Sequence, residues 1–169
     1  NMPYNFIEED YRDNEFNCPV VAFYPEVIKA NVEDIDRKPY HSPYVSLNKK
    51  VQFLKQLVNS LEDNTQVTKK DIHHAYDKAL EAYVAYREDV FTEGERAIQY
   101  ASEHKKQLIL LAGRPYHIDP EINHGIPKLL QGLDCVVISE DSVNTRADQK
   151  TVKVLNQWTY HTRLYDSAK

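Results

Sequence analysis

Apolar residues recur at helical spacing along two stretches of the first hundred residues. The first stretch follows Ser46, a residue type that caps helix N-termini. Its apolar positions are Leu47, Val51, Leu54, Leu57, Val58 and Leu61. The second begins with Thr68-Lys69-Lys70-Asp71, which resembles a capping box, and its apolar stripe continues to about residue 102. We therefore predict two helices; the second is on the order of 50 Å long, and Gly94 could bend it.

Two short apolar runs in the second half of the chain predict strands. Residues 107–112 and 135–138 lack the alternation of a half-exposed strand, which is typical of strands buried on both faces. Between them, Pro127 fits the first turn of a short helix near residues 125–131. Two strands joined by a helix predict a parallel, right-handed βαβ unit, whose two polar loops leave the sheet at the same edge.

The remaining segments carry weaker patterns. Residues 1–17 predict an irregular N-terminal segment, and the apolar run over residues 18–25 predicts a further short strand that ends at its second proline. Residues 29–45 combine prolines with charges and predict a loop, whereas residues 149–168 predict a helix. We expect the chain to be a piece of a longer protein.

The polar loop after residues 107–112 is the candidate functional site, because open α/β sheets bind ligands beyond the carboxyl ends of their strands. Gly113 would let a ligand approach the backbone, and Arg114 offers a planar donor fork for phosphate or carboxylate. Free N–H groups near Gly125 and Ile126 would add partial positive charge. The loop thus predicts an anion or acyl-thioester pocket. The alternative is a structured loop whose polar side chains satisfy buried carbonyls.

Other polar residues near the two loops complete this hypothesis. His117 and Asn123 are expected to orient a ligand by donating hydrogen bonds, and Arg146 is expected to be a second cation at the same rim. The spacing of His117 and His124 matches no standard zinc pattern, which favours hydrogen-bonding histidines over a metal site. Ser142 has no base or oxyanion partner in the sequence, which argues against a serine nucleophile.

Composition narrows the function further. The net charge of -5 argues against general nucleic-acid binding, and no apolar run is long enough for a membrane span. Two cysteines in 169 residues provide no disulfide framework and favour a cytoplasmic location. A cubane iron–sulfur cluster needs more thiolates than Cys18 and Cys135, so we expect no cofactor in this chain alone.

Three segments carry motifs of a known family. They are Val-Thr-Lys-Lys-Asp-Ile-His-His-Ala-Tyr at 67–76, the stretch Gly-Arg-Pro-Tyr-His-Ile-Asp-Pro-Glu-Ile-Asn-His-Gly-Ile-Pro at 113–127, and Ile-Ser-Glu-Asp-Ser from residue 138 onward to Arg146. These segments resemble the 2-hydroxyacyl-CoA dehydratase family, and within it the large activase-related members. The similarity covers most of residues 16–165, and the Gly-Arg-Pro-Tyr-His-Ile-Asp-Pro segment is its most specific part.

The resemblance implies an α/β fold, a Rossmann-like or flavodoxin-like parallel sheet with a long helical insertion. It also implies a system in which an activator hydrolyses ATP and delivers an electron through iron–sulfur clusters to an acyl-CoA dehydratase. Two features depart from the family. Ser142 stands about where dehydratase subunits place a cluster cysteine, and the ATP-binding motifs of the activator are absent. Cys18 is the one candidate cluster ligand, and a 4Fe–4S cluster is expected only in the full-length assembly.

We therefore expect residues 18–169 to form a Rossmann-like α/β domain with a helical excursion over 46–102, preceded by the irregular segment 1–17. Its expected function is a binding and assembly module, not catalytic alone, whose ligand site comprises Gly113, Arg114, His117, Asn123 and Arg146. Its expected partners are other domains of the parent protein and an acyl-CoA ligand, with no nucleic acid and no membrane. Two alternatives stay open: a dehydratase-like half-site that acquires a cluster on assembly, and a structural spacer built on the long helix.

Overall fold

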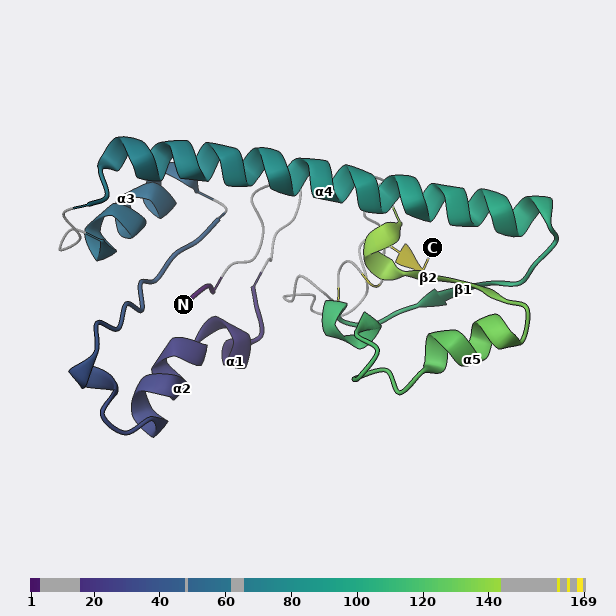
Figure 1. Ribbon diagram of the computed structural model, residues 1–169, viewed down its shortest axis with the longest axis horizontal. Helices are drawn as coiled ribbons and strands as arrows, with labels where there is room; N and C mark the ends of the chain where they lie inside the picture. Colours follow the sequence, from purple (N-terminus) through teal and green to yellow (C-terminus); the bar gives the residue numbers. More distant parts are fainter. Residues whose placement is uncertain are drawn as a thin grey trace, which may run out of the picture. The chain divides into compact units, whose positions relative to one another are not determined.

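The computed structural model describes residues 1–3, 16–47, 49–61, 66–143, 161, 164 and 167–168. The chain divides into two compact units: unit 1 comprises residues 1–81 and 156–159, and unit 2 comprises residues 82–155 and 160–169. Figure 1 labels the helices and strands. In chain order, the elements are α1 (Pro19–Ala22), α2 (Tyr24–Asn31), η1 (Ile35–Arg37), α3 (Lys50–Ser60), α4 (Lys69–Glu103), β1 (Leu108–Leu111), η2 (Pro115–Ile118), α5 (Ile126–Gly132), β2 (Val136–Ser139) and η3 (Glu140–Ser142).

Unit 1 has its core where α3 packs on the first turns of α4. Leu54 from α3 and Ile72 and Tyr76 from α4 form the buried cluster. The ring centroids of Phe53 and Tyr76 lie 5.4 Å apart, and Lys50 lies over the Tyr76 ring at 5.1 Å. The helical spacing in the sequence therefore predicted this helix pair correctly.

The start of α3 differs from the prediction. Ser46 is buried, and α3 begins only at Lys50, with Lys49 in the N-cap position and no side-chain cap bond. The apolar periodicity predicted the helix correctly, whereas the prediction that Ser46 caps its N-terminus is wrong. An N-cap preference is worth about 1 kcal/mol, which the burial of a neighbouring segment readily overrides.

The N-terminus of α4 confirms the predicted capping box. The Thr68 hydroxyl oxygen accepts from the Asp71 N–H at 3.2 Å, and an Asp71 carboxylate oxygen accepts from the Thr68 N–H at 2.9 Å. The same oxygen accepts from the Thr68 hydroxyl at 2.6 Å, and these bonds lower the pKa of the Asp71 carboxyl. From there α4 continues through Gly94 to Glu103, so the predicted length is confirmed and the chain stays helical at the glycine.

The predicted strand over residues 18–25 is wrong. Pro19 opens α1, and Pro25 lies in the first turn of α2. Both prolines occupy positions whose N–H has no helical partner, so they start helices rather than ending a strand. Val20 and Val21 are exposed, which a strand buried on both faces would not allow. The loop predicted over 29–45 holds apart from the end of α2 and the short η1.

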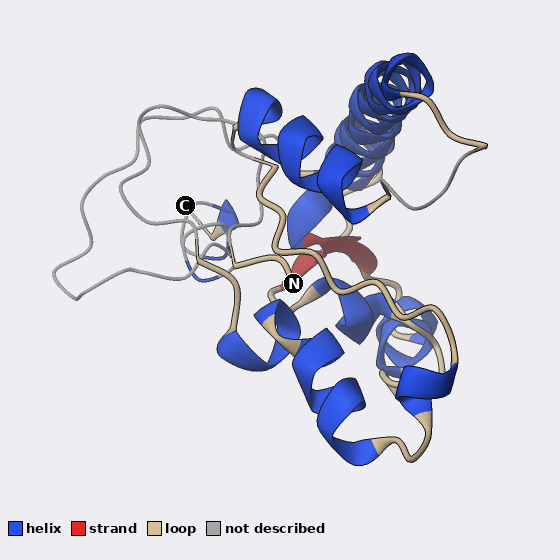
Figure 2. Cartoon of the chain, turned by 90° about the vertical axis from the view of Figure 1, so that its left-hand side faces the viewer, coloured by secondary structure: helices blue, strands red, loops and turns tan. Residues whose placement is uncertain are grey.

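Unit 2 contains the predicted βαβ arrangement. β1 and β2 pair in parallel, with Leu108 opposite Val136 and Leu111 opposite Ser139. α5 connects them, with Pro127 in its first turn, as the sequence indicated. Figure 2 shows these strands in red among helices, and they form a two-stranded sheet in the described part of the chain. The fold is thus mixed α/β, with mostly helical content, a small parallel sheet and one long helix. The helix predicted over 149–168 falls mostly outside the described residues.

The same turn leads from helix to strand at both ends of unit 2. After α4, the Lys106 N–H bonds the Ala101 carbonyl, with Lys105 in the left-handed region at φ 53°. After α5, the Cys135 N–H bonds the Leu130 carbonyl, with Asp134 at φ 64°. Both are Schellman motifs, which satisfy the last carbonyls of a helix and reverse the chain.

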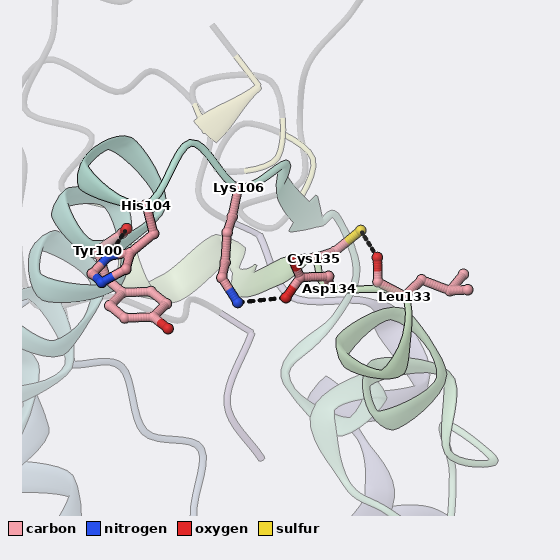
Figure 3. A network of polar contacts seen from close by, with 6 residues as sticks. All are labelled: Tyr100, His104, Lys106, Leu133, Asp134 and Cys135. Carbon is pink, nitrogen blue, oxygen red and sulfur yellow. Dashed lines mark hydrogen bonds and ion pairs between the residues drawn. The ribbon is translucent and has the colours of Figure 1, made fainter.

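An ion pair joins these two turns. Figure 3 shows Lys106 Nζ reaching an Asp134 carboxylate oxygen, at 2.5 Å. This hydrogen bond raises the pKa of the Lys106 ammonium. The Tyr100 and His104 rings stack beside it, with centroids 4.1 Å apart. Each of the two turns leads directly into one strand. The ion pair between Lys106 and Asp134 therefore links the amino ends of β1 and β2, where Leu108 lies opposite Val136.

Candidate functional site

A cavity of about 300 Å³ opens in unit 2 at the carboxyl ends of β1 and β2. Four of the five ligand residues expected from the sequence line it, namely Gly113, Arg114, His117 and Asn123. The fifth, Arg146, lies outside the described residues. The other lining residues are Leu110, Leu111, Ala112, Ile118, Ile122, Ile126, Ser139, Glu140 and Asp141. The parallel pairing of the strands brings both sets of loop residues to one place, as the βαβ prediction required.

Arg114 and His117 are held by a short 3-10 turn. The His117 N–H donates to the Arg114 carbonyl at 2.8 Å, and His117 Nδ1 accepts from the Arg114 N–H at 2.9 Å. Because Nδ1 acts as the acceptor, the neutral imidazole carries its hydrogen on Nε2. The imidazole therefore has a hydrogen-bond donor at Nε2, and its role in orienting a ligand stays a prediction.

Gly113 has a structural role that the sequence did not suggest. A Cβ atom at this position would lie 2.6 Å from His117 Nδ1, far inside a normal contact distance. The open side of the glycine is thus occupied by the imidazole, and this close approach lets His117 fold back onto the loop. Gly113 acts here by making room for a side chain of the site.

Asn123 organises the loop before α5. Its side-chain amide donates to the Ile118 carbonyl at 3.2 Å, and its side-chain oxygen accepts from the Gly125 N–H at 2.8 Å. The Ile126 N–H bonds the Asn123 carbonyl. The expectation of free N–H groups at Gly125 and Ile126 is therefore wrong, because a polar side chain in a tight turn bonds nearby N–H groups before any ligand can.

The sequence placed the loop over residues 139–146 at the site but gave no role to its two acids. Glu140 and Asp141 follow β2 directly, and Glu140 is only 4% exposed. The Ser139 hydroxyl donates to an Asp141 carboxylate oxygen at 2.5 Å, and the Ser142 hydroxyl donates to the Ser139 carbonyl at 2.7 Å. Two adjacent acids directly after an apolar run were the available signal. The described lining residues thus include two carboxylates and one guanidinium, that of Arg114.

The position of the acidic turn is set by α4. A Cβ atom on Gly94 would lie 2.0 Å from the Ser142 carbonyl oxygen. The helix and the turn therefore approach each other closely at the position where Gly94 has no side chain. Figure 1 shows the second half of α4 and α5 on opposite sides of the β1–β2 pair. Gly94, which could have marked a bend, instead permits a close approach between helix and turn.

The described residues do not fit an iron–sulfur cluster. Cys18 belongs to unit 1 and Cys135 to unit 2, and the whole chain holds two cysteines. No group of three or more His, Cys, Asp or Glu side chains able to hold a metal ion occurs within the residues placed by the structure. A cubane cluster requires four ligands, so Cys18 could contribute only with thiolates from elsewhere.

Comparison with known proteins gives the family. Among the described helices, none combines the length and apolar character needed to cross a bilayer. No curated protein and no solved structure matches the chain. A family model does match, over residues 2–143, and its description is CoA enzyme activase uncharacterised domain (DUF2229). This match covers most of the 169 residues and confirms the resemblance to activase-related proteins. The chain therefore belongs to the family of CoA enzyme activase domains so described.

Proposed function

We propose that this domain is a binding and assembly module of a CoA enzyme activase-related protein, and that the cavity of unit 2 receives part of an acyl-CoA ligand. The observation that carries the proposal is the place of the cavity, at the carboxyl ends of two parallel strands, where open α/β sheets bind ligands. The family description refers to a CoA enzyme, which supports the choice of a CoA thioester as the ligand class. The βαβ unit between flanking helices supports a Rossmann-like sheet as the complete fold of the parent region.

Four polar residues have a role in this proposal. Arg114 donates from its guanidinium to an oxygen of the ligand, as a planar fork suits carbonyl, carboxylate or phosphate. His117 donates from Nε2, since its Nδ1 is held by the Arg114 backbone. Asn123 keeps the loop closed around the ligand through its bonds to Ile118 and Gly125. Arg146, which lies outside the described residues, would add a second cation.

The wider role of the parent protein would be ATP-driven electron transfer to an acyl-CoA dehydratase in the cytoplasm. Neither ATP hydrolysis nor cluster binding is assigned to these residues. The chain lacks a Walker loop, and its two cysteines are too few for a cubane cluster. Other domains of the parent protein would therefore contribute the nucleotide site and most or all cluster thiolates, and this domain would contribute ligand binding and contacts between domains.

The test is a calorimetric titration of acetyl-CoA into the full chain and two matched variants. Arg114→Ala removes the cation of the cavity, whereas Arg96→Ala removes an exposed cation of α4 that pairs with Glu93. A lost hydrogen bond to a charged donor costs about 1.5–3 kcal/mol, so Arg114→Ala should weaken binding about 10- to 100-fold. Arg96→Ala should bind as wild type does. Equal affinity for wild type and Arg114→Ala, or no binding by wild type, overturns the proposal.

A further inference from the structure

Building on the proposed function, we infer that His117 selects thioesters by donating a hydrogen bond from Nε2 to the thioester carbonyl oxygen of the ligand. Thioethers and the free thiol of CoA lack that oxygen and should bind less tightly. His117 would then determine specificity at the reacting end of the ligand. Three features of the loop after β1 lead to this inference: the orientation of the imidazole, its tautomer and its place in the cavity.

The imidazole of His117 is held by contacts that all come from its own loop. Its Nδ1 accepts from the Arg114 N–H at 2.9 Å. The ring occupies the space beside Gly113, where a Cβ atom would lie 2.6 Å from Nδ1. The Tyr116 ring meets it edge-on, with the two centroids 4.5 Å apart. The imidazole is therefore positioned before a ligand arrives, so less conformational freedom is lost on binding.

The tautomer of His117 makes Nε2 a hydrogen-bond donor. The Arg114 N–H needs an acceptor, and only an unprotonated ring nitrogen can provide one. Turning the ring over would place a carbon atom opposite this N–H and lose the bond. The hydrogen of the neutral ring is thus on Nε2, and this nitrogen can recognise only a group that accepts a hydrogen bond.

The place of His117 leaves this donor available to a ligand. Within the part of the chain that the structure describes, Nε2 has no protein acceptor. His117 is exposed and contributes to the lining of the cavity, so a ligand can reach its imidazole. Ile118 and Ile122 belong to the same lining. A single donor among apolar side chains suits a carbonyl group that carries an apolar substituent.

The acyl end of a CoA thioester offers one strong acceptor, the carbonyl oxygen. A thioether sulfur accepts only weakly, and a thiol offers a weak donor that the Nε2 hydrogen cannot use. The cavity holds about 300 Å³, at the small end of the range of about 300–1,000 Å³ for ligand pockets, which suits this compact end. An acyl-CoA bound with its acyl end in the cavity would therefore bring its carbonyl oxygen to His117 Nε2.

Calorimetric titrations of the full chain with acetyl-CoA and S-ethyl-CoA isolate the contribution of this oxygen. The two compounds differ only in the thioester carbonyl group, and both retain the pantetheine amides and the nucleotide. A hydrogen bond between neutral groups changes affinity by about 2- to 10-fold, so wild type should bind acetyl-CoA about 5-fold more tightly than S-ethyl-CoA. The control Arg96→Ala, in which an exposed cation of α4 is removed, should show the same preference.

Two substitutions of His117 separate the Nε2 donor from the contact within the loop. His117→Asn keeps an oxygen near the position of Nδ1 that can accept from the Arg114 N–H, but it has no atom at the position of Nε2. It should bind acetyl-CoA and S-ethyl-CoA equally. His117→Gln places an amide nitrogen near the position of Nε2 and lacks the acceptor at Nδ1. It should keep a preference of about 2-fold while both affinities fall, because the loop loses its bond to the Arg114 N–H.

The preference compares two ligands on the same variant, so a general loosening of the loop cancels out. Equal affinities of wild type for the two ligands, or an unchanged preference in His117→Asn, overturn this inference and leave the proposed function standing. Nitrogen-15 NMR tests the tautomer without a ligand, since the imidazole signals that disappear in His117→Asn should show a hydrogen on Nε2. A hydrogen on Nδ1 also overturns the inference. Failure of acetyl-CoA to bind wild type overturns both proposals.

Discussion

Replacing Gly94 with alanine should destabilise unit 2, although alanine is the better helix former. Gly94 lies inside α4, where glycine costs about 1 kcal/mol relative to alanine. Without tertiary contacts, Gly94→Ala would therefore raise the free energy of unfolding by about that amount. The added Cβ would, however, lie 2.0 Å from the Ser142 carbonyl oxygen and 2.9 Å from its carbonyl carbon.

The clash outweighs the gain in helix propensity. Cβ contacts essentially never fall under 3.0 Å, so the turn at Ser142 must withdraw from α4 by about 1 Å. The clashing atoms are backbone and cannot rotate away as a side chain would. We therefore take the upper part of the usual 1–3 kcal/mol overpacking range, about 3 kcal/mol. Subtracting the gain of about 1 kcal/mol leaves a net loss of about 2 kcal/mol.

Gly132 provides a matched control, because the same substitution meets open space there. No atom lies within 4 Å of a Cβ built on Gly132, which is the last residue of α5. Gly132→Ala should therefore stabilise the protein by up to about 1 kcal/mol. The two variants separate packing from helix propensity, since only the first has a clash.

Urea unfolding followed by circular dichroism measures both free energies, and hydrogen exchange of residues 136–143 locates the effect. Gly94→Ala should lower the unfolding midpoint and speed exchange in this segment, whereas Gly132→Ala should raise the midpoint. A Gly94→Ala protein as stable as Gly132→Ala would show that the Ser142 turn does not touch α4, and would refute the packing described above.

Three further substitutions test the helix ends. Thr68→Ala removes the capping box of α4 and should lower the unfolding free energy by about 1 kcal/mol in urea melts; an unchanged midpoint would contradict the cap. Lys105→Gly should raise it by about 0.5–1 kcal/mol, because glycine adopts the positive φ of this position without strain; a loss of stability would argue against that backbone geometry. Lys106→Met should lower the urea midpoint at about pH 8, because the bond to Asp134 raises the pKa of Lys106 above 10.5. That contribution is complete below pH 10.5 and disappears as the pH rises through the raised pKa, so a difference between wild type and variant that persists at about pH 12 would refute it.

The features that the sequence predicted well depend on neighbours along the chain. The capping box at Thr68 needs residues three positions apart, and Pro127 marks a first helical turn by its own chemistry. The runs that became β1 and β2 are continuous and apolar, which favours a parallel pair. The predicted burial on both faces is wrong for the described residues, because Ile138 is the one buried residue of the two strands and the others are half-buried. Each of these signals lies within a few consecutive residues, so it could be recognised in the sequence without knowledge of the tertiary structure.

The features that the sequence missed depend on contacts between distant segments or on competition within a turn. Nothing in the sequence around Gly94 indicates that Ser142 packs against it. The N–H of Gly125 looked free because nothing in the pattern shows that the Asn123 side chain turns back to bond it. The apolar run after Cys18 has strand-forming residues but no partner strand among the described residues, and its prolines suit helix starts equally well. In each case the local structure depends on which other residues contact the segment, and a local sequence pattern does not specify those contacts.

One side of the cavity therefore depends on α4, although α4 contributes no residue to its described lining. Its acidic side is the turn after β2. This turn can pack directly against α4 because Gly94 has no side chain at the point of contact. Its other side is the loop after β1, which is held together by hydrogen bonds of the Asn123 and His117 side chains to the loop's own backbone. Only the acidic side depends on α4. Withdrawing it by about 1 Å should thus weaken acetyl-CoA binding in Gly94→Ala while the bonds within the first loop persist. A substitution outside the lining that changes affinity in this way would show that the long helix positions the site.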